Sequence, residues 1–453
     1  MKKLSILIAA LLFLVPTHAQ KIEFYKTIKE ANVGVVGRHL GTNNNNEFFI
    51  SGKNLIKRDA ELNQISTVKL NPDNYANTVG VVSKILHEAL VEDKLITHHF
   101  KESVGNVSND YLTIFNLDGV QLAQVQIGVA SRSYLSQDGK YIAYVPKKEE
   151  KVYVLELVGN TFKEVGTEKY LGSFVIMTNE GSVLQLKFDE GECIINYKDF
   201  IKGSTKEVKF GTKNGAGAYA NIKHFYEGKK LVVPYLLMTT TGKKWKDEEE
   251  SAGIGAYVVS YATGELEVLG HYEAQFSEDV INEYKTQRIP KKKDREEGIY
   301  NLHISQVLLM NDDLYLLSEI TKSKEYRADN GSTTYTFWYD GMFLSKLGPK
   351  DTGTIYIDRH QVLPYRLRSP MMFPAKEGVV LMENHPDGNT FKIKNYRISK
   401  DFEIKEGEQI FLNRNRKKGE LLEFNYVKKV DDYSYIVYSL SGKKSSFYKL
   451  IIE

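Results

Sequence analysis

Four of the histidines fall on strands that the apolar pattern predicts, and a ring of imidazoles could bind a transition metal. They are His39, His87, His224 and His303. Each lies at a different distance from the turn that follows its strand, which spreads the four side chains over about 15 Å at ~3.3 Å per strand residue. Successive side chains also alternate between the two faces of a strand. We therefore expect ordinary polar or core histidines and no metal site.

Other sequence motifs for catalysis or cofactor binding are incomplete or absent. Residues Gly215–Ala220 approximate a dinucleotide-binding glycine loop, but a predicted strand follows where phosphate binding needs a helix. The sequence has no P-loop, serine-hydrolase elbow, HExxH motif or calcium loop. Its 58 acidic residues leave a glycosidase-type carboxylate pair possible, although sequence spacing selects none. We predict no cofactor, and whether the chain is an enzyme stays open.

Aromatic and charged residues in predicted loops are the remaining candidates for ligand contact. The runs 243–250 and 291–297 mix basic and acidic residues, a pattern that usually keeps a loop hydrated. The functional alternative is a charged clamp in which exposed aromatic rings stack on a sugar or a peptide. Trp338 falls within a predicted strand, and we expect it in the core. The predicted contact residues are Trp245, Tyr284, Arg288, Tyr326 and Arg327.

The composition bounds the class of protein. Of 453 residues, 61 are Lys or Arg and 58 are Asp or Glu, which gives a net charge of +3 and no basic excess for nucleic-acid binding. A hydrophobic fraction of 42% with 26% charged residues excludes a disordered chain and a polytopic membrane protein. Cys193 is the single cysteine, which excludes internal disulfides and a cysteine-based zinc ribbon.

Residues 1–19 have the pattern of a secretory signal peptide. Lys2 and Lys3 precede the apolar run Leu4–Val15, and Ala19 ends a small-residue cleavage site. The run is too short to span a hydrocarbon layer of about 30 Å. No cysteine stands at the predicted cleavage site directly after this run, which excludes a lipoprotein anchor. We therefore predict cleavage after Ala19 and a bacterial protein that is soluble in the periplasm or outside the cell, without stable membrane insertion.

The rest of the chain repeats one unit of four apolar strands. An acidic or glycine-containing turn followed at once by an apolar strand occurs eight times, at intervals of about 45 residues in the first half of the chain. In the third unit the predicted strands are Val129–Leu135, Lys140–Val145, Val152–Leu157 and Thr161–Val165. Asp-Gly pairs between such strands favour tight hairpins. Four antiparallel strands at this period are typical of β-propeller blades.

The two ends of the chain complement each other. The last unit supplies only the strands Leu421–Val430, Tyr433–Leu440 and Phe447–Ile452, whereas Lys21–Ile28 is a spare strand before the first unit. Pairing of the N-terminal strand with the C-terminal blade would complete that blade and remove an exposed edge. We therefore predict an all-β fold in which residues 20–453 form a single propeller of about eight blades. The alternative is seven blades with one large insertion.

Two segments carry a resemblance to known propellers. The stretch SQDGKYIAYV with KVYVLEL resembles strand pairs of TolB-like and other secreted bacterial propellers. The segment Tyr335–Gln361 is similar to passages in uncharacterised exported propeller-like proteins. The resemblance implies the fold and carries no functional residue to this sequence.

The long connections of the predicted blades all belong to one class. Turns between the first and second strands, and between the third and fourth, are short. Long segments occur only between the second and third strands or between blades, which places them on one face. They are Lys101–Asn109, Thr239–Gly253, Ser277–Gly298, Thr321–Thr334 and Asn384–Thr390. Because long loops in a compact fold are usually functional or disordered, this face is the predicted binding face.

These features predict a monomeric exported binding protein that recognises a protein or glycan partner on the long-loop face. The alternative is a glycan hydrolase or lyase that uses carboxylate or Tyr/His chemistry. An envelope-assembly or structural role also stays open.

Overall fold

The structure is a computed structural model, and it describes most of the chain after the predicted signal peptide. No helix among the described residues is long and apolar enough to cross a membrane. The predicted signal peptide and its cleavage site lie outside the described residues. The residues that the structure describes are 22–30, 38–60, 62–70, 81–103, 106–129, 131–172, 174–189, 192–211, 217–219, 221–226, 228–238, 250–262, 264–288, 299–327, 333–363, 370–387, 390–412, 421–422, 427–441 and 444–452.

The described strands form eight antiparallel sheets, and each contains a path of four strands. The chain divides into two compact units, residues 1–34 with 370–453 and residues 35–369. Six sheets belong to the second of these units. In chain order, this unit contains β2 (Arg38–Asn43), β3 (Asn46–Ser51), β4 (Asn54–Arg58), β5 (Gln64–Lys69); β6 (Val81–Val91), β7 (Lys94–Ser103), β8 (Asn106–Asn116), β9 (Gln121–Val129); β10 (Arg132–Leu135), β11 (Tyr141–Val145), β12 (Lys151–Val158), β13 (Thr161–Lys169); β14 (Phe174–Met177), β15 (Ser182–Asp189), β16 (Glu192–Asp199), β17 (Ser204–Gly211); β18 (Gly217–Tyr219), β19 (Lys223–Phe225), β20 (Lys230–Met238), β21 (Glu250–Ser260), β22 (Glu267–Gln275), β23 (Ile299–Tyr300); and β24 (Leu302–Met310), β25 (Asp313–Arg327), β26 (Thr333–Leu347), β27 (Thr352–Ile357), β28 (Gln361–Leu363).

The unit of residues 1–34 and 370–453 contains the other two sheets. In the second of them β1 pairs with β36, from Ile22 opposite Ile452 to Glu30 opposite Ser445. The predicted pairing of the N-terminal strand with the C-terminal strand is therefore confirmed. The strands of this unit are β29 (Met371–Ala375), β30 (Gly378–Asp387), β31 (Thr390–Ser399), β32 (Ile404–Glu406); and β33 (Leu421–Leu422), β34 (Lys428–Asp431), β35 (Ser434–Ser441), β36 (Lys444–Ile452), β1 (Ile22–Glu30).

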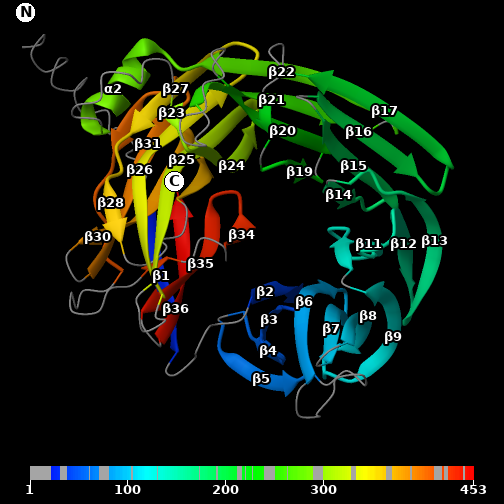
Figure 1. Ribbon diagram of the computed structural model, residues 1–453. Helices are drawn as coiled ribbons and strands as arrows, with labels where there is room; N and C mark the ends of the chain where they lie inside the picture. Colours follow the sequence, from blue (N-terminus) through cyan, green and yellow to red (C-terminus); the bar gives the residue numbers. More distant parts are fainter. Residues whose placement is uncertain are drawn as a thin grey trace, which may run out of the picture. The chain divides into compact units, whose positions relative to one another are not determined.

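Consecutive sheets pack face to face, and apolar side chains fill the space between them. Figure 1 shows the six sheets of residues 35–369 following one another in chain order. Leu184 and Tyr197 from one sheet share a buried cluster with Leu231 and Tyr257 from the next. Strands of neighbouring sheets are in contact, as β10 is with β14 and β20 with β24. This is the blade arrangement of a β-propeller, so the predicted all-β propeller of about eight blades is confirmed.

Within a blade, burial falls from the inner strands to the fourth. Five of the eight side chains of β15 are buried in succession, whereas those of β17 alternate between half-buried and exposed. A strand covered on both faces takes an unbroken apolar run, and a strand at the rim alternates. The alternation along Ser204–Gly211 therefore places β17 at the outer edge of its blade.

The predicted turn at Asp138-Gly139 connects β10 and β11. Gly139 has a φ of +68°, which disfavours any residue with a Cβ atom. A Cβ at this position would also lie 2.0 Å from Cγ2 of Val91 in the preceding blade. The glycine is therefore required both by the turn and by the close approach of two blades.

The prediction that residues 277–298 form a loop is wrong over their first half. Residues Glu278–Arg288 form the helix α2, and the Ser277 side chain accepts a hydrogen bond from the Val280 backbone at 3.3 Å. Ser277 is therefore the N-cap of the helix. Glu278 and Asp279 follow it in the first turn, where their carboxylates interact favourably with the positive end of the helix dipole. Residues 289–298 lie outside the described part of the chain.

Three other predicted loops are largely extensions of hairpins. Residues 321–327 and 333–334 belong to β25 and β26, residues 101–103 and 106–109 belong to β7 and β8, and residues 384–387 with 390 belong to β30 and β31. All three hairpins join the second and third strands of their blades, as predicted. In the fourth loop, residues 239–249 lie outside the described chain and residues 250–253 begin β21.

Candidate functional site

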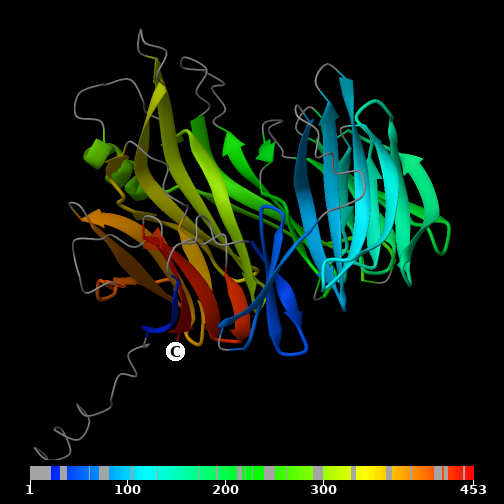
Figure 2. The same ribbon diagram turned by 90° about the horizontal axis from the view of Figure 1, so that it is seen from below.

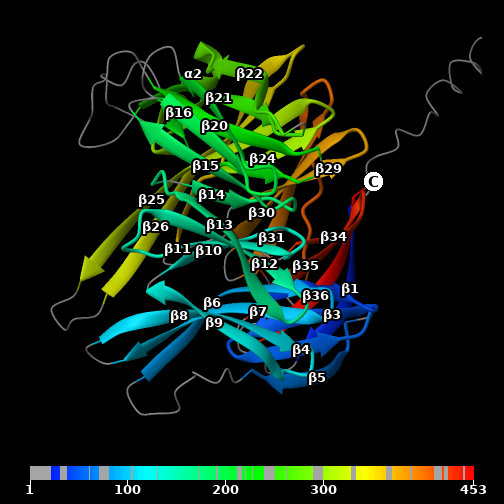
Figure 3. The same cartoon turned by 90° about the vertical axis from the view of Figure 1, so that its right-hand side faces the viewer.

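The longest of these hairpins extends beyond the rest of its blade. We call residues 321–327 of β25 and 333–339 of β26 the β-arm. Its strands pair from Thr321 opposite Tyr339 to Arg327 opposite Thr333, and a register shift separates the arm from the body of the sheet between Ile320 and Thr321. Figures 2 and 3 show β25 and β26 projecting from the sheet. β28 covers only the base of the β-arm, where its residues 361–363 pair with 337–339.

The register assigns the side chains of the β-arm to two faces, because residues directly opposite each other in an antiparallel pair share a face. We call the face that carries Tyr335 and Phe337 the aromatic face. Ser323, Glu325 and Arg327 share it. We call the opposite face the lysine face; it consists of Lys322, Lys324, Tyr326, Thr334, Thr336 and Trp338.

Charges on the aromatic face compensate each other. The Glu325 carboxylate accepts a hydrogen bond from Arg327 Nε at 2.6 Å and one from the Tyr335 hydroxyl at 3.3 Å. The rings of Tyr335 and Phe337 stack with centroids 6.2 Å apart. Tyr335 is 45% exposed, so this face presents apolar ring surface beside a neutral ion pair.

The lysine face carries two ammonium groups beside aromatic rings. Lys324 Nζ lies 4.9 Å from the centroid of the Tyr326 ring, a cation–π contact worth about 0.5–1 kcal/mol at an exposed site. Tyr326 is 44% exposed. Lys322 lies opposite Trp338, which in turn lies opposite the exposed Val362 of β28. Trp338 is in the predicted strand, but it is partly buried on the β-arm and not in the core as expected.

A buried ion pair supports the base of the β-arm. Arg359 Nη1 lies 2.7 Å from Glu319 Oε2, and both side chains are 1% exposed. The Arg359 guanidinium also lies 4.7 Å from the ring centroid of Tyr339. Arg359 precedes β28 and Glu319 lies in β25, so the pair ties the segment after β27 to the strand from which the arm projects.

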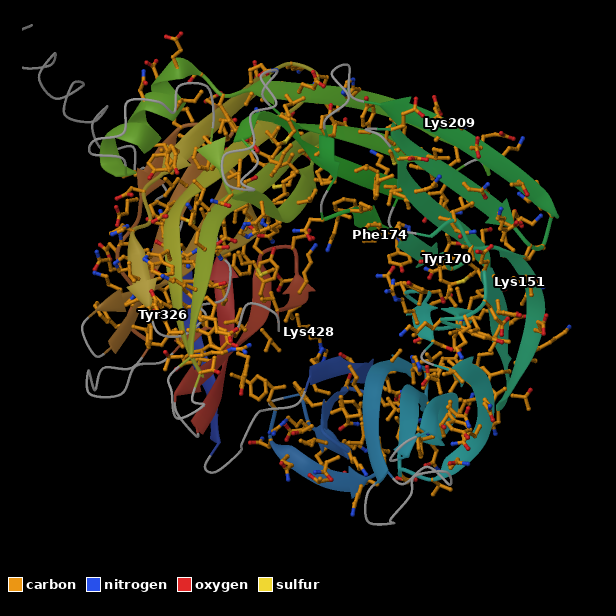
Figure 4. The ribbon with its side chains drawn as sticks, in the orientation of Figure 1. Lys151, Tyr170, Phe174, Lys209, Tyr326 and Lys428 are labelled. Carbon is orange, nitrogen blue, oxygen red and sulfur yellow. The ribbon has the colours of Figure 1, made fainter. Side chains whose placement is uncertain are left out.

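The structure brings two of the five predicted contact residues together. Tyr326 and Arg327 both lie near the tip of the β-arm, on opposite faces, and Figure 4 labels Tyr326 there. Trp245 lies outside the described residues. Arg288 is the last residue of α2, and its side chain also lies outside the described part.

Tyr284, the fifth predicted contact residue, points into the core. It is 7% exposed, and its ring packs edge-on against Phe343 and Tyr356, with centroids 6.0 Å away in each case. The physical reason is the helix α2, which brings one apolar side against β27. A deletion of residues 277–298 would therefore remove core residues.

An open depression lies on the third blade of the chain. Its volume is about 560 Å³, and its lining is charged. Glu149 and Glu150 belong to the connection between β11 and β12, and Lys151 begins β12; like the β-arm, this connection joins the second and third strands of its blade. Figure 4 labels Lys151 at this site. The lining residues are Glu149, Glu150, Lys151, Thr167, Glu168 and Lys169.

Two side-chain clusters contain the residue types of acid–base catalysis. His98 Nδ1 lies 2.7 Å from Ser133 Oγ and its Nε2 lies 3.6 Å from Asp110 Oδ2, but His98 is 2% exposed and Ser133 7%. The Tyr235 hydroxyl donates to Glu273 at 2.6 Å, yet Tyr235 is fully buried. Because Ser133 and Tyr235 are both buried, neither cluster presents its potential nucleophile to solvent.

Two of the four histidines on predicted first strands have hydrogen-bond partners within their own blades, and the side chain of His87 lies outside the described part of the structure. His39 Nε2 lies 2.6 Å from Glu47 Oε2, and His224 Nε2 lies 2.5 Å from the Tyr261 hydroxyl. Burial lowers the pKa of His224 to about 4, so the imidazole is neutral at pH 7. Among the described residues no group of three or more His, Cys, Asp or Glu side chains is arranged to hold a metal ion.

Comparison with known proteins gives similarity at the level of structure alone. No known family model matches the sequence, and no curated protein is similar to it. The chain is similar to the WD40 domain of SCAP from fission yeast, with 9% identity, a TM-score of 0.46 and coverage of 96% of this chain and 94% of that one. It is also similar to the Dos1 propeller, with 11% identity, a TM-score of 0.39 and 95% of each chain covered. TolB from Acinetobacter baumannii matches with 12% identity, a TM-score of 0.27 and 80% of each chain covered.

The sequence prediction missed most of the β-arm. Lys322, Lys324, Tyr335 and Phe337 were not among the expected contact residues. The signal for them is the segment 333–339, TTYTFWY, whose threonines and aromatic residues all have high strand propensity. Its pairing with the polar segment 321–327 is what turns an apparent loop into a ribbon with two different faces.

Proposed function

We propose that this chain is an exported binding protein whose β-arm contacts a macromolecular or glycan partner. The observation that supports the proposal is the β-arm itself, a ribbon that projects from its blade with Tyr326 and Tyr335 each more than two-fifths exposed. Large aromatic side chains gain most when a partner covers them, and they are enriched at the centres of interfaces. The predicted signal peptide supports a location in the periplasm or outside the cell, where we expect a monomer.

A glycan-active enzyme is the second candidate. The depression on the third blade supplies three carboxylates, those of Glu149, Glu150 and Glu168. A glycosidase needs two such groups on either side of the scissile bond. The depression is open and has no aromatic platform among its lining residues, whereas the β-arm has aromatic rings on both faces. Binding by the β-arm is therefore the better supported function.

Shortening the β-arm is expected to abolish binding and leave the fold intact. In the variant, Asn-Gly replaces residues 324–336, so that the paired residues Ser323 and Phe337 are joined by a two-residue hairpin turn. The mature protein and the variant are compared on a glycan array and in a pull-down from the periplasmic and extracellular fractions of the host. We expect the affinity for any partner of the intact protein to fall at least about tenfold, which corresponds to ~1.4 kcal/mol.

The matched control is Phe174→Ala, which removes an aromatic side chain that is 49% exposed on another blade. Figure 4 shows Phe174 on β14, away from the β-arm. This variant should bind as the intact protein does. Full binding by the shortened variant, with an unchanged circular dichroism spectrum, would refute the assignment of the β-arm.

A further inference from the structure

We propose that the lysine face of the β-arm binds an acidic polysaccharide, one that carries uronate carboxylates along an extended chain. The inference rests on the proposed function of the β-arm, and it adds the chemical class of the ligand and the face that binds it. Three properties of the face support it: its charge, its rings and hydroxyls, and its shape.

The lysine face is positively charged because the acidic side chains of the β-arm and of the bulge beside it lie outside this face. Lys322 and Lys324 lie on this face, two residues apart. Glu325 lies on the aromatic face, where Arg327 neutralises it. Asp340 falls at the bulge that ends the arm and lies 3.5 Å from His360 Nδ1. Among the described residues of the β-arm, the lysine face therefore carries two cations and no carboxylate.

The lysine face also has the groups that recognise sugars. Rings of Tyr326 and Trp338 offer flat apolar surface to the C–H faces of pyranose rings. On β26, Thr334 lies opposite Tyr326 and Thr336 lies between Thr334 and Trp338, and their hydroxyls can both donate and accept hydrogen bonds. A protein partner would fit a surface of rings and cations as well, but it would not need a row of hydroxyls between them.

The shape of the face favours a polymer over a small ligand. The β-arm is a two-stranded ribbon, and side chains two residues apart on one face stand about 7 Å apart along each strand. Lys322, Lys324 and Tyr326 therefore form a line of contacts along the ribbon. An extended chain with a carboxylate on each sugar presents repeated charges to such a line. A nucleic acid would usually meet a larger basic surface, and the whole chain has a net charge of only +3.

The test is isothermal titration of the mature protein with three polymers: polygalacturonate, neutral galactan and a thymidine oligonucleotide. We expect the protein to bind polygalacturonate, and to bind galactan and the oligonucleotide at least about tenfold more weakly. Raising the ionic strength from ~50 to ~300 mM should weaken the binding of polygalacturonate because salt screens exposed charges. Equal affinity for the oligonucleotide, or an affinity for polygalacturonate that salt does not change, would overturn the proposal.

Charge reversal on the lysine face and charge neutralisation on the aromatic face supply the matched comparison. The Lys322→Glu/Lys324→Glu variant should lose at least about tenfold in affinity for polygalacturonate, whereas Glu325→Gln/Arg327→Gln, which leaves the lysine face unchanged, should stay within about twofold. Both pairs of residues are solvent-accessible, and thermal unfolding of each variant verifies the fold. If Lys322→Ala/Lys324→Ala, which avoids added repulsion, also binds as the intact protein does, the proposal is wrong.

These outcomes are distinct from failure of the proposed function. If polygalacturonate does not bind but the shortened β-arm loses a protein or neutral-glycan partner, the β-arm remains the binding site and the acidic-polysaccharide inference fails. If the shortened β-arm retains every partner, the proposed function fails as well.

Discussion

The Arg359→Met variant is expected to lose about 3–5 kcal/mol of stability, because it leaves the Glu319 carboxylate buried without its cation. Both side chains are 1% exposed, and the charged atoms lie 2.7 Å apart. Methionine keeps much of the side-chain volume, so the loss reports the uncompensated charge more than a cavity. The loss in the free energy of unfolding is measured by equilibrium unfolding in urea, with tryptophan fluorescence as the signal.

The control for this prediction is the double variant Glu319→Gln/Arg359→Met. Removing both charges replaces a buried ion pair by neutral groups, a change that is often close to neutral in stability. We expect the double variant to recover most of the loss, and the single variant Glu319→Gln completes a double-mutant cycle. If Arg359→Met alone unfolds within about 1 kcal/mol of the intact protein, the ion pair does not stabilise the base of the β-arm.

Removal of β1 should lower the stability of the protein by as much as the Arg359→Met substitution or by more. A chain that begins after Glu30 lacks the strand that pairs with β36 from Ile452 to Ser445. It loses several backbone hydrogen bonds, each with a net value of about 1 kcal/mol, and the contact of Ile22 with the apolar cluster around Val437 and Leu450. We expect a loss of at least about 5 kcal/mol, measured as a lower unfolding temperature by differential scanning calorimetry.

The truncated chain should also associate, because β36 becomes an unpaired edge. Light scattering during size-exclusion chromatography would show this as a mass that rises with protein concentration. A synthetic peptide of residues 20–31 should restore both the monomer and the unfolding temperature by adding the missing strand. A truncated chain that stays monomeric and melts with the intact protein would contradict this role of β1.

The sequence was sufficient to predict the blades because their determinants are local. Asp138-Gly139 sets a tight turn, and the apolar runs beside it have the length and composition of strands. The predicted strand Val152–Leu157 matches β12 to within a residue at each end. Even the pairing of the two chain ends could be predicted, because one blade lacked a strand and the N-terminus had one to spare.

The helix α2 escaped prediction because its apolar pattern is sparse. Only Val280, Ile281 and Tyr284 supply an apolar side within Glu278–Arg288, and polar residues occupy the rest. The N-cap at Ser277 and the two acids after it were the local signal of a helix start. Which blade the helix packs against depends on contacts with Phe343 and Tyr356, about sixty and seventy residues after Tyr284, and sequence spacing does not specify such contacts.

The β-arm could not be predicted from the sequence either, because its structure depends on the pairing of two separate segments. Residues 321–327 are polar and charged, so their composition is that of a loop, and only pairing with 333–339 orders them as a strand. That register decides which face each charge occupies, because a slip of one residue would exchange the two faces. Tyr326 and Arg327 were predicted as neighbours in one site, but their adjacency in the strand places them on opposite faces.

Hydrogen exchange with and without polygalacturonate tests most directly whether the β-arm is the binding site. We expect the backbone amides of residues 321–327 and 333–339 to exchange more slowly when the polymer is bound, while those of the depression, residues 149–151 and 167–169, do not change. Slower exchange at the depression together with unchanged exchange along the β-arm would contradict the account and would favour the carboxylates of Glu149, Glu150 and Glu168 as the functional site.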